Sequence, residues 1–166
     1  HAPQTLVARQ ARRVPATLTA LTTITILSGG FVAGLDAGHI FNTFPLMGGR
    51  VVPPGYGSID GWRNLFENPV AAQFNHRVLA MATALCTWVA WWIANRRVWG
   101  SGLRRGLRVA AVMVLIQLAL GVATLLLAVP VWVAVAHQLG AVALLAAVLW
   151  SAAGAFDARA AVSAQD

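Results

Sequence analysis

The sequence predicts an all-α membrane protein: a transmembrane four-helix bundle with both termini in the cytoplasm and a long ordered outer loop between the first two helices. Of its 166 residues, 58% are hydrophobic and only 10% are charged, and the mean hydropathy is +0.69. A soluble domain carries roughly a quarter of charged residues, so most of this chain's surroundings should be lipid. Four apolar segments and an uneven distribution of arginines complete the prediction.

Each apolar segment is long enough to cross a membrane as a helix. An α-helix needs about 20 apolar residues to span ~30 Å of hydrocarbon. Strands of this length would need a closed barrel of many more segments to satisfy their backbone groups. We therefore predict one domain over residues 1–166. Its expected helices and outer loop are residues 16–36, 70–94, 107–128 and 131–156, with the loop at 37–69.

The first segment follows Pro15 and carries glycines at four-residue spacing, at Gly30, Gly34 and Gly38. Glycines spaced in this way lie on one helix face, where another helix or a flat ring can approach closely. Both interpretations remain open from the sequence. The chain starts at His1 rather than Met, and no signal peptide is visible, so we expect it to be processed or cut from a longer one.

The connection over residues 37–69 is longer than most loops between helices. It contains the stretches FNTFPLMGG, VVPPGYGS and GWRNLF, which are rich in apolar and turn residues and contain no low-complexity run. This composition favours an ordered cap over the outer end of the bundle.

Prolines mark the remaining helix boundaries. Asn68 and Pro69 open the second segment, with Asn68 as the expected N-cap and Pro69 at the first helical position. Pro130 separates the third and fourth segments, so their connection must be very short. These two helices are therefore expected to be antiparallel neighbours.

Arginine supplies all twelve basic residues, and its distribution predicts the topology. The arginines of the chain ends and of the connection between the second and third segments are Arg9, Arg12, Arg13, Arg96, Arg97, Arg104, Arg105, Arg108 and Arg159. The connection at 37–69 holds only Arg50 and Arg63. The positive-inside rule then places both termini in the cytoplasm and this loop outside. In a membrane chain this charge indicates orientation and headgroup contact, so we expect no nucleic-acid partner.

Two histidines lie at matched depths in the membrane. His76 is seven residues past Pro69, and His137 is seven residues past Pro130. At 1.5 Å per residue, each imidazole lies roughly 10 Å below the start of its helix, on two helices that run in the same direction. Intramembrane polar residues tend to mark functional sites. His39, at the end of the first segment, is interpreted as an interfacial residue.

The matched histidines predict a metal cofactor between two helices. Zinc prefers about four protein ligands, and no carboxylate lies at this depth. Cys86 is the one cysteine, so neither a disulfide nor a thiolate cluster can form within the chain. A haem needs only two axial ligands, and its large apolar ring suits the core of a helix bundle. His76 and His137 are therefore the predicted bis-histidine ligands of one haem iron.

Polar residues surround the expected ligands. Arg77 is costly in a span unless it reaches an anion, and two interpretations fit: contact with a haem propionate, or snorkelling to the outer headgroups. Gln73, Asn75 and Gln138 are candidates for orienting the imidazole nitrogens, although each could equally bridge helices by hydrogen bonding.

At these residues the sequence resembles the haem A synthase family. The matching stretches are GLDAGHIFNTFPLMGGR (34–50), VVPPG (51–55), NLFENPVAAQFNHRVLA (64–80) and HQLGA (137–141). The resemblance implies an oxidoreductase that converts haem O to haem A by oxidising a porphyrin methyl to a formyl group, for cytochrome oxidase biogenesis. It further implies a multi-pass protein of the bacterial inner (plasma) membrane.

The resemblance covers one of the family's two tandem bundles, the C-terminal one. In that bundle it implies haem b bound by His76 and His137. Signatures of the N-terminal bundle are absent, so the resemblance implies that this chain takes part in the reaction only with that catalytic half, or a homologous bundle, as its partner. Two alternatives remain: a stand-alone membrane b-type cytochrome that passes electrons to a partner, and a small transporter or assembly factor without a cofactor.

Overall fold

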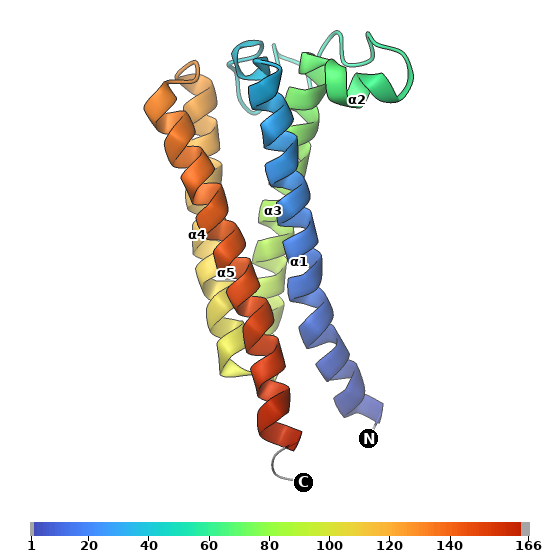
Figure 1. Cartoon of the computed structure of the whole chain (residues 1–166), viewed down its shortest axis with the longest axis vertical. Helices are drawn as coiled ribbons and strands as arrows, with labels where there is room; N and C mark the ends of the chain where they lie inside the picture. Colours follow the sequence, from blue (N-terminus) through green and yellow to red (C-terminus); the bar gives the residue numbers. More distant parts are fainter. Residues whose placement is uncertain (1, 164–166) are drawn as a thin grey trace.

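Four long helices form an antiparallel bundle in the computed structural model, which describes residues 2–163 (Figure 1). The helices are α1 (Ala2–Gly34), α3 (Pro69–Arg96), α4 (Ser101–Leu126) and α5 (Val131–Ser163). Each contains a stretch long and apolar enough to cross a membrane, namely Arg9–Gly34, Pro69–Arg96, Ser101–Leu126 and Val131–Ala155. The predicted all-α class with four membrane-spanning helices is confirmed.

Three helices extend beyond the bounds predicted from hydropathy. α1 begins at Ala2 rather than near residue 16, so Pro15 lies inside the helix instead of before it. α4 begins at Ser101 instead of residue 107, and α5 continues to Ser163 instead of residue 156. Hydropathy locates the stretch that contacts hydrocarbon, whereas backbone hydrogen bonding continues through the arginine-bearing turns beyond it.

The bundle consists of two hairpins, α1–α3 and α4–α5. Each helix contacts two neighbours, in the cyclic order α1, α3, α4, α5, so α3 and α5 lie diagonally across the bundle. The α4–α5 turn is as short as predicted, and its residues Ala128 and Val129 adopt positive φ angles of 55° and 58°. The amide of Val129 donates to the carbonyl oxygen of Thr124 at 2.7 Å and closes the last turn of α4.

The α4–α5 hairpin is held by close backbone contact between glycines. A Cβ atom on Gly106 would lie 2.6 Å from the Cα atom of Ser151, and one on Gly154 would lie 2.6 Å from the carbonyl carbon of Gly102. Real Cβ atoms do not approach so closely, and small residues at helix interfaces are what allow transmembrane backbones to meet. Gly102, Gly106 and Gly154 therefore bring α4 and α5 together at the end of the hairpin that the sequence predicts to face the cytoplasm.

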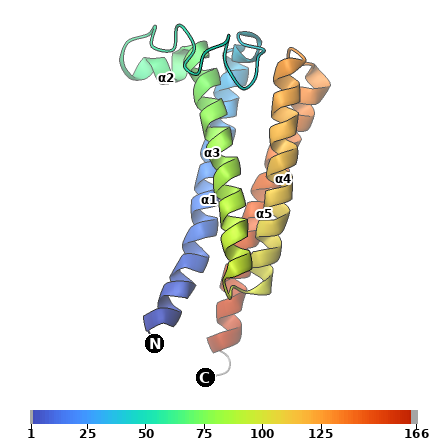
Figure 2. The ribbon, with the colours of Figure 1, turned by 180° about the vertical axis from the view of Figure 1, so that it is seen from behind.

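The packed core lies in the half of the bundle nearer the chain termini. Its largest fully buried members are Leu103, Leu107 and Val148, joined there by Leu18 and Trp99. Towards the opposite end, the α4–α5 hairpin diverges from α1 and α3 (Figures 1 and 2). This divergence opens the space between the hairpins that holds the candidate site.

The loop between α1 and α3 is ordered by a network centred on Asn68. It contains the 3₁₀ turns η1 (Ala37–His39) and η2 (Gly61–Arg63) and the short helix α2 (Asn64–Glu67), which lie across the end of the α1–α3 hairpin (Figure 2). Asn68 caps α3 by accepting from the amide of Val70 at 3.0 Å, and its Nδ2 donates to the carbonyl oxygen of Gly55 at 2.9 Å. The predicted N-cap and the predicted ordered loop are confirmed.

Cysteine labelling tests the predicted orientation. In a Cys86→Ala background, we expect Gly57→Cys in the outer loop to react with a membrane-impermeant maleimide on intact spheroplasts. Val98→Cys, at a side chain that is 99% exposed in the α3–α4 turn, should react only after permeabilisation. The reverse labelling pattern would show that the positive-inside assignment is inverted.

The glycine contact makes a second prediction. Gly106→Ala should lower the stability of the bundle by about 1–3 kcal/mol, because the added methyl group forces α4 and α5 apart. A matched control is Gly30→Ala in α1, where an added Cβ meets no atom within 4 Å. Thermal unfolding in detergent, followed by tryptophan fluorescence, measures both. Equal melting temperatures for the two variants would contradict the proposed role of the contact.

Candidate functional site

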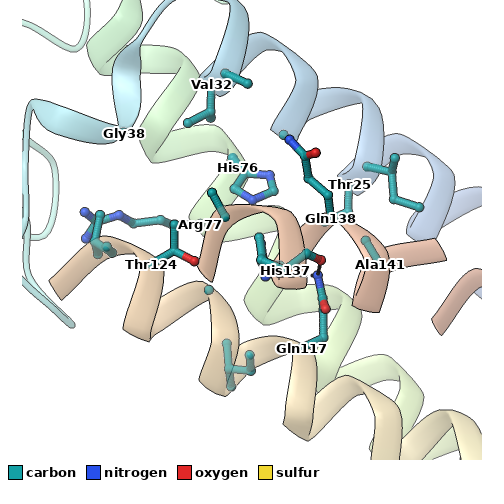
Figure 3. A pocket seen from close by; sticks show the side chains of 18 of the residues that line it. Thr25, Val32, Gly38, His76, Arg77, Gln117, Thr124, His137, Gln138 and Ala141 are labelled. Atoms are coloured by element: carbon teal, nitrogen blue, oxygen red, sulfur yellow. Dashed lines mark hydrogen bonds between the residues drawn. The ribbon is translucent and has the colours of Figure 1, made fainter. Parts of the chain in front are cut away.

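A cavity of about 590 Å³ lies between the two hairpins in the half of the bundle below the outer loop. All four long helices line it, and most of its wall is apolar, with valine, leucine, alanine and glycine predominating. Both His76 and His137 contribute to the wall, and their rings face the same space (Figure 3). The two imidazoles that the sequence placed at one depth are therefore brought into one cavity.

His76 extends from α3 towards α1, and a glycine provides the room for its ring. A Cβ on Gly29 would lie 3.1 Å from Cε1 of His76, so the imidazole lies directly against the α1 backbone. Ser28, the residue before Gly29 on α1, places its Oγ 2.9 Å from Nδ1 of His76. The ring is thus fixed on one side by a polar partner, and its Nε2 forms no hydrogen bond with the described residues.

His137 extends from α5 towards α4 in a similar arrangement. A Cβ on Gly121 would lie 2.9 Å from Cε1 of His137. The amide nitrogen of Gln117 lies 3.0 Å from Nδ1 of His137 and 2.7 Å from its backbone carbonyl oxygen. Each hairpin therefore supplies one imidazole, one glycine that makes room for it and one polar side chain that contacts its Nδ1.

This donor set suits a metal that brings its own equatorial ligands. Histidines that bind metals usually hydrogen-bond through the second ring nitrogen, which fixes the ring's orientation. Within residues 2–163, no three His, Cys, Asp or Glu side chains come together. Two imidazoles in an apolar cavity match the two axial positions of a porphyrin iron better than they match a four-ligand zinc site.

Arg77 lies at the cavity wall and holds the outer loop. Its Nη1 donates to the carbonyl oxygen of Thr43 at 2.7 Å, and its Nη2 donates to that of Phe41 at 2.6 Å. The sequence predicted two alternative roles for Arg77, contact with a propionate or snorkelling to headgroups, and it did not predict these bonds to the loop. Arg77 is one of the residues that line the cavity, and its Nε–H is buried without a partner among the described residues.

The polar neighbours suggested by the sequence have other partners. Gln73 donates to the carbonyl oxygen of Phe41 at 3.2 Å, and Asn75 accepts from the hydroxyl of Tyr56 at 3.2 Å. Both therefore bind the outer loop, and neither contacts an imidazole nitrogen. Gln138 lines the cavity (Figure 3).

Sequence reasoning missed Ser28 and Gln117, the side chains that contact the imidazoles. A signal for Gln117 was present, since it is the one amide side chain in the apolar stretch 107–128. Ser28 gave no such signal, because serine is common in transmembrane helices.

The glycines that accommodate the rings were also missed. Gly29 and Gly121 make room for the imidazoles, whereas an added Cβ on Gly30 or Gly34 would meet nothing within 4 Å. On Gly38 it would lie 3.0 Å from a methyl carbon of Val129. Gly38 lies in η1, past the end of α1, and its close contact is with the α4–α5 turn, whereas Gly30 and Gly38 both border the cavity.

His39 lies apart from the paired imidazoles, at the outer mouth of the cavity. Its Nε2 is 3.5 Å from Oδ1 of Asp36, and both side chains are largely exposed. The interfacial interpretation of His39 agrees with this position.

Comparisons with known proteins place the chain among proteins of one kind. A family model described as cytochrome oxidase assembly protein (COX15-CtaA) matches residues 1–149. The heme A synthase of Granulibacter bethesdensis is 51% identical over 138 residues, which cover 83% of this chain and 36% of that protein. The heme A synthase of Paramagnetospirillum magneticum is 44% identical over 134 residues, covering 81% of this chain and 37% of that protein.

A human relative gives the same result. The heme A synthase COX15 of Homo sapiens is 39% identical over 153 residues, which cover 89% of this chain and 36% of that protein. The chain thus spans little more than a third of the length of these curated relatives. No solved structure matches it.

The loop contacts of Arg77 yield a prediction. Arg77→Met keeps the apolar stem and removes both donors, so amide hydrogen exchange over residues 41–50 should become roughly tenfold faster or more. Arg63→Gln is the control, because Arg63 pairs only with Glu67, at 2.6 Å, among the described residues of the same loop. Unchanged exchange in Arg77→Met, measured by mass spectrometry, would contradict the anchoring role.

Proposed function

Because the chain belongs to the cytochrome oxidase assembly protein family (COX15-CtaA), we propose that it is the haem-b-binding half of a haem A synthase. Its relatives carry the name heme A synthase, and the chain aligns with about a third of each. The proposed reaction of the whole enzyme is oxidation of a haem O methyl group to the formyl group of haem A. This chain takes part beside an N-terminal catalytic half or a homologous bundle.

The observation that carries the proposal is the pair of imidazoles facing one apolar cavity from diagonal helices. His76 and His137 would hold haem b through their Nε2 atoms, and Gly29 and Gly121, which have no side chains, leave room for the two rings against the helix backbones. When bound, haem b supplies one-electron redox chemistry at its iron. The protein's contribution is to position the ligands, exclude water and tune the iron through hydrogen bonds and burial.

Arg77 completes the proposed site at its outer end. A haem bound between the histidines would carry anionic propionates, and Arg77, which lines the cavity from the position next to His76, has a buried Nε–H without a partner among the described residues. A guanidinium retains its charge and has five donors, two of which already hold the loop. We therefore assign Arg77 two tasks: it fastens the loop that covers the cavity, and it balances the charge of a propionate.

The outer loop borders the proposed site and would limit the access of water to it. Arg77, Gln73 and Asn42 bind the loop to α3 and α4, with Asn42 donating to the carbonyl oxygen of Leu125 at 2.8 Å. Exclusion of water strengthens every electrostatic interaction between the iron and its surroundings. In the proposed topology this loop lies on the outer surface of the bacterial inner (plasma) membrane.

A second candidate is a stand-alone b-type cytochrome that passes electrons to a membrane partner. It is favoured by one observation: both proposed axial ligands come from this chain, so no second half is needed to hold the haem. Expression with and without the N-terminal half, followed by extraction and chromatography of the haem, separates the two. Haem A formed only when both halves are present supports the synthase; haem b alone under both conditions supports the cytochrome.

The proposal predicts a low-spin b-type absorption spectrum. His76→Ala and His137→Ala should each abolish the low-spin bands in a reduced-minus-oxidised spectrum, because each removes one axial ligand. His39→Ala, at the cavity mouth, is the matched control and should keep them. Unchanged bands in both cavity variants would refute the ligand assignment, and a colourless wild-type protein after haem supplementation would favour a protein without a cofactor.

A further inference from the structure

The two cavity imidazoles have different kinds of partner at Nδ1: a hydroxyl, Ser28, at His76 and an amide nitrogen, that of Gln117, at His137. The hydroxyl of Ser28 donates to the carbonyl oxygen of Thr25 at 2.7 Å. A hydroxyl can donate or accept, so while it donates to Thr25 the same oxygen can accept from Nδ1 of His76, 2.9 Å away. Ser28 is thus compatible with the His76 tautomer that carries its proton on Nδ1 and leaves the lone pair of Nε2 free.

Gln117 is more restrictive towards His137. An amide nitrogen donates and does not accept, and the one of Gln117 donates both to the carbonyl oxygen of His137 at 2.7 Å and to its Nδ1 at 3.0 Å. Nδ1 of His137 is thus the acceptor. In a neutral imidazole the proton must then lie on Nε2, where it blocks the lone pair that would bind a metal.

Exchanging the amide oxygen and nitrogen of Gln117 does not remove the conflict. The exchange would place Oε1 where Nε2 now lies, 2.7 Å from the carbonyl oxygen of His137, so two acceptors would face each other. In the described arrangement Oε1 instead packs against Gly140, where any side chain would overlap it. Gly140 thus leaves the space that keeps the Gln117 amide in its donating orientation.

We propose that Gln117 is a positioning residue that holds His137 in the tautomer unable to bind iron, so that His76 is the pre-set ligand and His137 a conditional one. This inference rests on the proposed haem site. For Nε2 of His137 to bind iron, its proton moves to Nδ1, and Nδ1 becomes a donor. The nitrogen of Gln117 must then withdraw, and both of its hydrogen bonds to His137 break.

This movement requires the Gln117 side chain to leave the carbonyl oxygen of His137. Its Oε1 is buried without a partner among the described residues, and it could accept from the new Nδ1–H only in such a displaced position. Ser28 requires no such change, because its hydroxyl can accept from Nδ1 of His76 where it lies. The two hairpins therefore contribute unequally: α1–α3 presents a ready ligand, and α4–α5 presents one that becomes available only after a side-chain rearrangement.

Titration of ferric haem b into the purified cofactor-free chain tests whether His76 and His137 differ in their readiness to bind iron. His137→Ala retains the pre-set ligand and should bind haem with a high-spin spectrum. His76→Ala leaves only the conditional ligand and should bind roughly tenfold more weakly, since two hydrogen bonds must break. Equal affinities, or weaker binding by His137→Ala, would overturn the inference.

A suppressor experiment tests Gln117 itself. In the His76→Ala background, Gln117→Leu and Gln117→Met remove the amide and should each recover most of the lost affinity. Thr124→Val is the matched control: it also lines the cavity from α4, but its hydroxyl donates to the carbonyl oxygen of Leu120 at 2.8 Å and contacts no imidazole. Recovery with Gln117→Leu or Gln117→Met but not with Thr124→Val supports the inference; no recovery with either Gln117 variant contradicts it.

The outcomes also separate this inference from the proposed function. If both histidine variants keep the wild-type low-spin spectrum, the ligand assignment itself is wrong, and the inference fails with it. The alternative outcome is that both variants lose that spectrum, bind haem with equal affinity and show no change in affinity when Gln117 is substituted. In that case the haem site is supported, and only the role of Gln117 is refuted.

Discussion

The structure depends on the need to keep two imidazoles in an apolar membrane interior. A polar group buried in hydrocarbon without a hydrogen bond is costly, so each ring needs a partner on a neighbouring helix. Ser28 and Gln117 provide these partners, and Gly29 and Gly121 bring the helices close enough for the contacts to form. The spacing of the two hairpins follows from this arrangement, because each histidine is bound within its own hairpin and faces the other across a cavity.

The division of the bundle into a packed half and an open half follows from the same constraint. Glycine contacts and buried leucines close the half near the chain termini. In the outer half the two hairpins diverge (Figures 1 and 2), and the loop that Arg77 and Asn42 fasten links them there. A rigid base and a separately fastened cover together give a cavity of defined shape, as pre-organised ligand sites require.

The sequence predicted the four spans and the matched depth of His76 and His137, because both depend on signals that are local or regular. Apolar length gave the spans, Pro69 and Pro130 gave the starting points for counting depth, and Asn68 gave the cap of α3. The predicted starts of α1 and α4 and the predicted end of α5 were wrong, because these helices continue past their apolar stretches into turns that contain arginine. The partners of the imidazoles and the loop-holding role of Arg77 were out of reach, because they depend on which helix faces are adjacent in the folded bundle.

The central claim, that one iron is held by an imidazole from each hairpin, is tested most directly by magnetic resonance. The ferric, haem-loaded chain should be prepared with ¹⁵N-labelled histidine, and the hyperfine couplings of the ring nitrogens measured by pulsed electron paramagnetic resonance. The account predicts a low-spin signal coupled to two histidine nitrogens. A high-spin signal, or coupling to a single histidine, would contradict it.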